Sequence, residues 1–276
     1  MPFYRVLFCL VLTASIASAQ PPRPAPIGAK ADYHVHIKGG LSLDEALRRS
    51  KADGITYGVA INGGLNQPAP DDSSAAAFLR AMRPYPFFVA LQAEGREWVG
   101  IFSRATLEKF DYVFTDAMTW SDDTGKRMRL WIPEDVGTIA DPEKFMDMLV
   151  ARATKIFAEE PIDLYVNPTY VPDQLNAQYD RLWTPARMKK IVDGLAKNGI
   201  GMEINNRYRI PSRAFIMLGK QAGVKFSCGT NNAGAKDLGR NEYCIEMIEA
   251  CDLRAEHFWS PPAEGKKAVQ RKAPRR

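Results

Sequence analysis

Two of the three histidines in this chain stand two residues apart, in the segment "DYHVHIKGG". In an extended strand, every second side chain points to the same side. We therefore expect Asp32, His34 and His36 to share one face, where they can bind a divalent cation. Such an ion lowers the pKa of a bound water and polarises a substrate. The segment predicts a metal centre, and a pair of buried, hydrogen-bonded histidines is the alternative.

Further polar residues follow the other apolar segments. Glu94 could complete a metal site with the two histidines, and Glu97 is a rival for that position. Asp116 and Glu203 are also possible ligands, and either could act as a general base. Lys38 lies two residues past the histidine pair and could hold an anionic group. The remaining candidates carry amide or guanidinium groups suited to an anionic or polar substrate: Arg96, Asn167, Asn205, Arg207, Asn231 and Asn232.

The elements that must position these residues alternate between apolar and amphipathic segments. We expect strands over residues 31–36, 56–61, 87–91, 111–115, 162–166, 201–204 and 224–228. Helices are expected over residues 42–52, 72–82, 104–110, 142–158, 185–198, 211–221 and 237–251. This alternation indicates parallel strands joined by crossover helices. No glycine-rich phosphate loop opens the first helix. We predict a single α/β domain, a distorted seven-stranded (β/α)7 TIM-like barrel.

In such barrels the active site forms at the carboxyl ends of the strands. The candidate residues follow those ends, so we expect them to gather there. Residues 120–141 are longer than an ordinary connection and could form a loop over the site.

The two ends of the chain differ from its middle. Residues 1–19 combine Arg5, an apolar run and Ala-Ser-Ala, which is typical of a secretory signal peptide. We expect a proline-rich linker over 20–30, the barrel over 31–258 and a basic disordered tail over 259–276. No other apolar stretch is long enough to cross a bilayer. We therefore expect a periplasmic or secreted protein with no transmembrane segment after signal removal.

Charge and cysteine content narrow the function classes. Seven of the 37 basic residues lie in 1–19 and 266–276, which contain no acid, so 30 basic residues face 32 acidic ones elsewhere. The fold itself is therefore not expected to bind nucleic acid. Three cysteines remain after signal removal, and this odd number predicts buried thiols rather than a disulfide framework.

The order of the motifs resembles the polymerase and histidinol phosphatase (PHP) superfamily of metal-dependent phosphoesterases. "DYHVHIKGG" matches its opening D-x-H-x-H, and "QAEGREW" its bridging-glutamate segment. "IDLYVNP", "GMEINNR" and "GVKFSCGTNNA" resemble three later motifs in the same order. The resemblance covers most of residues 31–255. It implies a distorted seven-stranded barrel that holds two or three metals, with His34, His36 and Glu94 at ligand positions.

Several ligand positions of that family hold other residue types here. Asn62 and Gly63 stand where Asp-His is usual, and Met118 and Asn167 replace histidines. Asn231 and Ala233 stand where the last aspartate and histidine are expected. The resemblance therefore implies a reduced site with one divalent ion, which could be zinc, manganese or magnesium.

These observations predict an exported hydrolase, a phosphoesterase of the PHP type that acts on a small anionic substrate. One alternative is a non-catalytic protein that binds a polar ligand on the same barrel. Another is an adenosine-deaminase-like amidohydrolase, because "HVHIKGGLSLDEAL" is also similar to the opening of that family.

Overall fold

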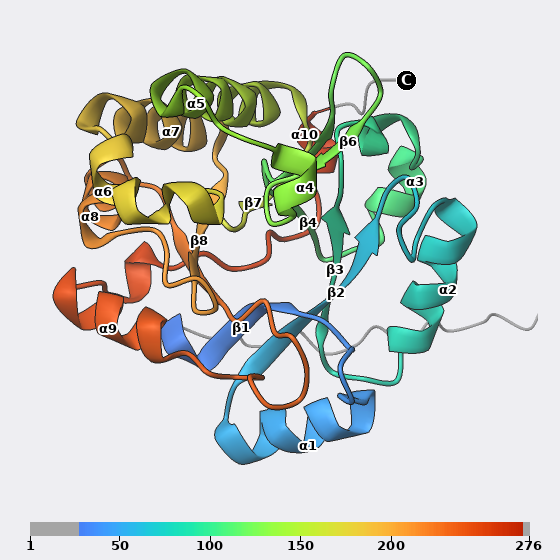
Figure 1. Ribbon diagram of the computed structural model, residues 1–276. Coiled ribbons are helices and arrows are strands. Elements are labelled where there is room, and N and C mark those ends of the chain that lie inside the picture. Colours follow the sequence, from blue (N-terminus) through green and yellow to red (C-terminus); the bar gives the residue numbers. More distant parts are fainter. Residues whose placement is uncertain (1–27, 273–276) are drawn as a thin grey trace, which may run out of the picture.

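Seven parallel strands form the centre of the protein (Figure 1). The computed structural model describes residues 28–272, so the predicted signal peptide and most of the predicted linker lie outside the described residues. The sheet order is β1-β2-β3-β4-β7-β8-β9. The two end strands, β1 (Ala31–Val35) and β9 (Phe226–Gly229), also meet, because Asn231 N donates to His34 O at 2.9 Å. The sheet is thus a nearly closed barrel, and the predicted fold class is confirmed.

Every expected strand is present, with its ends within two residues of the expected positions. The other barrel strands are β2 (Thr56–Gly63), β3 (Phe88–Ala93), β4 (Tyr112–Thr115), β7 (Leu164–Tyr165) and β8 (Gly201–Asn205). A separate antiparallel hairpin consists of β5 (Thr119–Ser121) and β6 (Arg127–Arg129). It lies in the long segment that was expected to form a loop over the site.

Helices follow the strands and cover the outside of the barrel. The longer ones are α1 (Leu43–Asp53), α2 (Asp72–Met82), α5 (Pro142–Glu159), α7 (Pro185–Asn198), α8 (Arg213–Gln221) and α9 (Glu242–Ala250). The short ones are α3 (Arg104–Leu107), α4 (Pro133–Val136), α6 (Tyr179–Leu182) and α10 (Ala268–Arg271). Short 3-10 helices are η1 (Gly28–Lys30), η2 (Glu97–Gly100), η3 (Asp173–Gln178) and η4 (Ala255–His257). Compared with the expectation, α3 ends earlier and α9 begins later.

Local sequence signals account for several helix ends. The Ser42 side chain accepts a hydrogen bond from Glu45 N at the start of α1, and the Thr184 side chain accepts one from Arg187 N at the start of α7. Both helices end at a glycine in the left-handed conformation, Gly54 with φ 65° and Gly199 with φ 63°.

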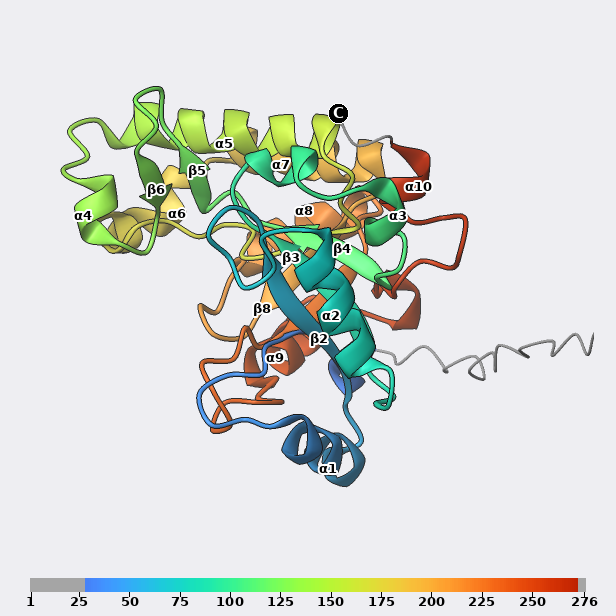
Figure 2. The same ribbon diagram turned by 90° about the vertical axis from the view of Figure 1, so that its right-hand side faces the viewer.

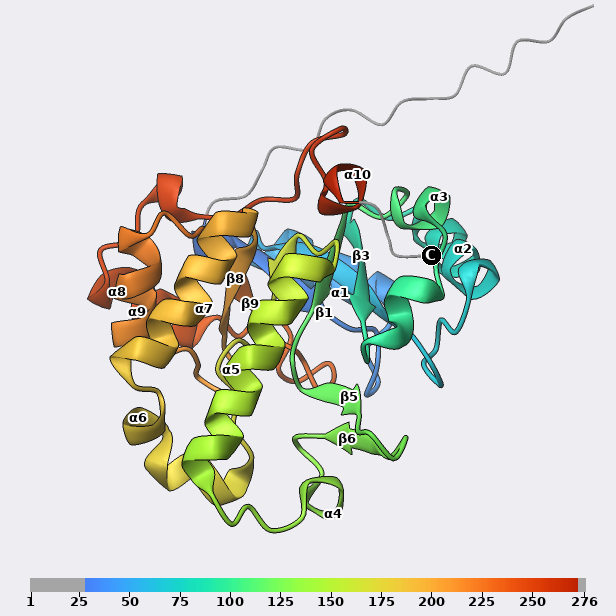
Figure 3. The ribbon, with the colours of Figure 1, turned by 90° about the horizontal axis from the view of Figure 1, so that it is seen from above.

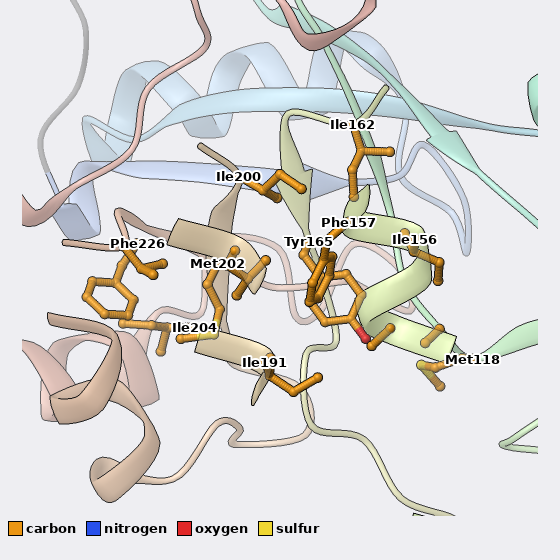
Figure 4. Packing of buried hydrophobic residues seen from close by; sticks show 14 of the residues in the cluster. Met118, Ile156, Phe157, Ile162, Tyr165, Ile191, Ile200, Met202, Ile204 and Phe226 are labelled. Atoms are coloured by element: carbon orange, nitrogen blue, oxygen red, sulfur yellow. The ribbon is translucent and has the colours of Figure 1, made fainter. Parts of the chain in front are cut away.

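The core has an outer and an inner part. Outside the barrel, Met202 and Ile204 of β8 pack with Ile191 of α7 and Phe157 of α5 (Figure 4). Inside the barrel, aromatic rings fill the space toward the amino ends of the strands. The Trp259 ring contacts the rings of Tyr33 and Tyr112 edge to face there, with centroids 5.2 Å apart in each pair. The amino end of the barrel is therefore packed with side chains.

The chain after Trp259 is ordered as far as residue 272, which differs from the disordered tail expected from residue 259. Val269 of α10 is buried in the main core. Ala268 N donates to Asp163 Oδ1 at 2.6 Å, and Lys267 Nζ donates to Glu108 O at 2.6 Å. Lys272 Nζ also donates to Phe157 O. Basic residues that suggested a solvated tail in fact hold the C-terminal segment against the barrel.

The cysteines correct a second expectation. Cys228 of β9 and Cys244 of α9 form a disulfide with a Cα–Cα distance of 5.8 Å, and Cys251 is the one buried free thiol within residues 28–272. β9 and α9 follow each other along the chain, and their packing brings the two thiols together. An odd number of cysteines does not reveal such a pair. Within residues 28–272, no helix is both long and apolar enough to cross a membrane.

Candidate functional site

A cavity of about 210 Å³ opens at the carboxyl ends of the barrel strands. This is where barrel enzymes bind their substrates. Most of its lining side chains are polar or charged. They lie at or just after the ends of all seven barrel strands, except for Trp131 of the long segment after β4. The lining residues are His36, Lys38, Asn62, Gln92, Glu94, Asp116, Met118, Trp131, Asn167, Arg207, Tyr208 and Asn231.

A bulge in β1 changes the direction of the side chains in the opening motif. Asp32 pairs with Tyr57 and Val35 with Val59, so β1 advances three residues while β2 advances two. The regular alternation is interrupted, and Asp32 does not line the cavity. Its carboxylate instead accepts hydrogen bonds from Thr230, at 2.5 Å from Oγ1 and 3.0 Å from N. The expectation that Asp32 shares a face with the two histidines is therefore wrong.

His34 is fully buried beneath the cavity, and both of its ring nitrogens have partners. Nδ1 lies 2.7 Å from Glu203 Oε1 and Nε2 lies 3.2 Å from Gln92 Oε1. The Gln92 amide nitrogen donates to Glu94, so the Gln92 oxygen is the atom that faces His34. Both ring nitrogens of His34 are thus in hydrogen-bond contact, and one of these contacts would have to break before His34 could bind a metal.

The His34–Glu203 pair depends on a glycine of the neighbouring strand. A Cβ added to Gly229 would lie 2.0 Å from Glu203 Oε1 and 2.9 Å from His34 Cβ. The other carboxylate oxygen of Glu203 accepts hydrogen bonds from Asn167 N at 2.7 Å and Asn205 Nδ2 at 2.9 Å. Glu203 is thus saturated with partners and does not line the cavity.

The asparagines link neighbouring strand ends to one another. Asn167 Nδ2 donates to Asp116 Oδ2 at 2.9 Å, and Asn167 Oδ1 accepts from Asn205 and Asn231. Asn167 and Asn231 have φ values of 46° and 44°, a left-handed conformation that asparagine tolerates better than most residues. Asn232 bonds to both backbone groups of His36 and thereby extends the contact between β9 and β1.

The cavity contains both acidic and basic groups. Glu94 Oε1 accepts hydrogen bonds from Asn62 and Gln92. Burial, together with the nearby charge of Asp116, raises the pKa of Glu94 to about 7. Burial also raises the pKa of Asp116. Lys38 and Arg207 supply positive charge, and burial followed by repulsion from Arg207 lowers the pKa of Lys38.

His36 is the one histidine that lines the cavity. Burial, with repulsion from His34 and Lys38, lowers its pKa well below the usual value. The third histidine, His257, belongs to η4 and accepts a hydrogen bond from Arg254 N. It does not line this cavity, so the described residues bring a single imidazole to its surface.

The donor set does not fit the expected one-metal site. Within the described residues, no group of three or more His, Cys, Asp or Glu side chains is placed to hold a metal ion. Asp32 is bonded to Thr230, and the nitrogens of His34 are occupied by Glu203 and Gln92. Of the four expected ligands, His36 and Glu94 alone reach the cavity.

The structure thus divides the predicted site residues into three groups. His36, Lys38, Glu94, Asp116, Asn167, Arg207 and Asn231 meet at the cavity. His34, Glu203 and Asn205 form the buried layer that supports it. Asp32, Asn232 and Arg96 point elsewhere, and Arg96 bonds to Glu160 and Thr115 instead.

Five lining residues were outside the predicted set. Asn62 and Gln92 stand at strand ends, a position that marks them as candidates in the sequence. Trp131 belongs to the long segment over the site, and it is 42% exposed. Met118 is marked only by the family resemblance, in which it replaces a histidine. Tyr208 carries no sequence signal for a site, because aromatic residues are common in every core.

Comparisons with known proteins agree with the fold. No protein-family model and no curated protein sequence matches the chain. The crystal structure of a histidinol phosphate phosphatase from Lactococcus lactis, in complex with zinc, L-histidinol and phosphate, superposes with a TM-score of 0.60. It is 13% identical, and the match covers 88% of this chain and 98% of that one. A mannanase catalytic domain from a Streptomyces species gives a TM-score of 0.43 at 13% identity, over 88% of this chain and 82% of that one. The first similarity supports a PHP-like fold, and at this identity it shows the fold alone.

Proposed function

We propose that this protein is a hydrolase that acts on a small anionic ester, with a phosphate monoester as the first candidate. One observation carries the proposal: a single cavity at the strand ends holds two cations, Lys38 and Arg207, together with two carboxyl groups, Glu94 and Asp116. Cations bind phosphate oxygens through charge-assisted hydrogen bonds. A carboxyl group that keeps its proton near neutral pH can protonate a leaving oxygen. The PHP-like fold supports a phosphate ester as the substrate.

Each residue has a defined task in this proposal. Lys38 and Arg207 bind the anionic group and offset its charge. Glu94, whose pKa is raised to about 7, donates a proton to the leaving oxygen. Asp116 is fixed by Asn167 Nδ2 and Met118 N, so its carboxylate can hold a water molecule in one orientation. Because the donor set does not fit a metal, no step here runs through an ion.

The test is a phosphatase assay on the purified protein with a panel of alkyl phosphate monoesters, whose alkoxide leaving groups need a proton, after treatment with a chelator. Release of inorganic phosphate is measured. Zinc, manganese and magnesium are added back in separate arms. We expect turnover in the chelated sample, a loss of about 100-fold in kcat for Glu94→Gln, and a raised KM for Lys38→Gln. Lys51→Gln on the exposed side of α1 removes the same charge as a control and should change neither constant.

Two results would count against the proposal. Turnover that appears only after an ion is added contradicts the metal-free mechanism. No turnover of any phosphate ester in any arm contradicts the hydrolase function itself.

A non-catalytic binding protein is the second candidate. Trp131 and Tyr208 present aromatic surface beside the amides of the cavity, a combination suited to a sugar ring. A thermal-shift screen with sugars in parallel with the assay separates the two functions. A bound sugar at 100 times its dissociation constant should add about 2.7 kcal/mol to the free energy of unfolding. Stabilisation without turnover would favour this candidate.

We also propose that the protein is exported to a periplasmic or extracellular location. The proposal rests on the signal-like residues 1–19. The disulfide between Cys228 and Cys244 supports it, because disulfides persist mainly in oxidising compartments. Cell fractionation with N-terminal sequencing tests it, and a cytoplasmic chain that still begins at Met1 would contradict it.

A further inference from the structure

A second cavity, of about 280 Å³, lies outside the barrel between α5 and the segment after β3. The β5–β6 hairpin lies beside α5 in this region (Figures 2 and 3). Two acidic side chains and two apolar side chains contribute to the cavity wall. Three basic residues complete it: Arg96, Arg152 and Lys155.

One of the acidic residues is already neutralised. Arg96 Nη1 donates to both oxygens of Glu160, at 2.9 and 3.0 Å. Trp98 Nε1 donates to the same carboxylate at 2.7 Å. The Glu160 carboxylate is buried and has three hydrogen bonds, so it has little capacity to balance a second cation. The nearby charge of Asp123 offsets part of the charge of Arg152.

Among the described residues, Arg152 forms no salt bridge, and its nearest counter-charge is that of Asp123. Its guanidinium lies 4.1 Å from the centroid of the Trp120 ring, which holds the side chain in place. Its Nε is buried and makes no hydrogen bond, and the Nε of Arg96 is in the same state. Burial, with repulsion from Arg96, lowers the pKa of Arg152.

Unpaired N–H groups of this kind need an explanation. Leaving one buried donor without a partner costs about 1–3 kcal/mol, and a bound ion is one of the usual reasons for it. Here two such donors belong to guanidinium groups that line the same cavity. Guanidinium groups bind oxyanions through parallel N–H···O hydrogen bonds.

We propose that this cavity is a second binding site, which takes a phosphate group between Arg96 and Arg152. Lys155 adds positive charge at its exposed side. The volume exceeds that of a phosphate ion, and Val99 and Ile156 supply apolar wall, so a small phosphorylated molecule also fits. The site is separate from the cavity at the strand ends, because the two cavities share no lining residue.

Isothermal titration of the whole protein with inorganic phosphate tests the proposal, at constant ionic strength with chloride as the competing ion. We expect two phosphates per chain. Arg152→Gln should lose one of them, or bind it at least about tenfold more weakly. Lys38→Gln should lose the other, which belongs to the proposed active site. Lys51→Gln, on α1 at the opposite side of the molecule from α5, should retain both (Figure 1).

Failure of this proposal can be told apart from failure of the proposed function. Equal phosphate stoichiometry and affinity for wild type and Arg152→Gln would overturn the second site whatever Lys38→Gln does. A crystal soaked in selenate gives a test that needs no variant. Anomalous density between the Arg96 and Arg152 guanidinium groups supports the site, and a cavity without that density overturns it.

Discussion

At the scale of single residues, the surroundings of His34 decide its chemistry. A histidine in a D-x-H-x-H segment predicts a metal ligand, yet Glu203 and Gln92 occupy both of its ring nitrogens. The arrangement requires a residue without a side chain at position 229, where a Cβ would collide with Glu203. Because position 229 has no side chain, the His34–Glu203 pair can form under the cavity.

Gly229→Ala tests this dependence. The added methyl group must displace the buried Glu203 carboxylate or the backbone of β9, so we expect a loss of about 1–3 kcal/mol in the free energy of unfolding. Urea denaturation measures it. Gly100→Ala is the matched control, because a Cβ added there meets nothing within 4 Å, and its effect should stay within about 0.5 kcal/mol. Equal effects of the two changes would show that the site tolerates the methyl group.

At the scale of elements, β9 and α9 are tied together next to the cavity. The Cys228–Cys244 disulfide joins the strand to the helix, and Cys244 N donates to Asn206 Oδ1 after β8 at 3.0 Å. The segment between the two cysteines carries Thr230, Asn231 and Asn232. The disulfide therefore limits the motion of the loop that supports the bulged strand β1.

Removing the disulfide should lower stability. It closes a loop with a sequence separation of 16 residues, for which chain entropy gives about 3 kcal/mol. We expect the same fall in melting temperature from a reducing agent and from the double change Cys228→Ser with Cys244→Ser. Cys251→Ala should leave the response to the reducing agent intact, since that thiol is free. A wild-type protein whose melting temperature does not respond to reduction would contradict this role.

At the scale of the whole molecule, the C-terminal segment closes the amino end of the barrel. Asp163, just before β7, accepts hydrogen bonds from Val113 N and Ala268 N and so connects the barrel to α10. Burial raises its pKa to about 6, although both hydrogen bonds act in the opposite direction. The stability that this contact between the barrel and α10 contributes therefore depends on pH.

The sign of that dependence follows from the direction of the shift. The folded protein favours the protonated Asp163, so its contribution is complete below pH 3.8 and is lost as the pH rises through about 6. The contribution is about 3 kcal/mol. Asp163→Asn should remove this decline from the free energy of unfolding measured between pH 4 and 6 by urea denaturation. Asp71→Asn is a control for the opposite direction of pH dependence. Hydrogen bonds from Ser74 lower the pKa of Asp71, so its contribution to stability is present at higher pH and is lost as the pH falls. Parallel profiles for Asp163→Asn and wild type would refute the assignment.

The sequence by itself determined the elements and the place of the site. Helix ends depend on residues only a few positions away, such as the N-caps Ser42 and Thr184 and the terminal glycine Gly54. The order of strands and helices could therefore be predicted. Parallel strands then require that polar strand ends such as Glu94 and Asp116 gather at one rim.

Only the tertiary structure decided what those polar groups do. The β1 bulge turned Asp32 to Thr230, a contact between residues 198 positions apart, and His34 met Glu203 across 169 positions. The disulfide and the ordered C-terminal segment also join distant parts of the chain. A residue type and its local spacing indicate which chemistry is available, but hydrogen-bond partners depend on packing between elements, which short-range patterns do not encode.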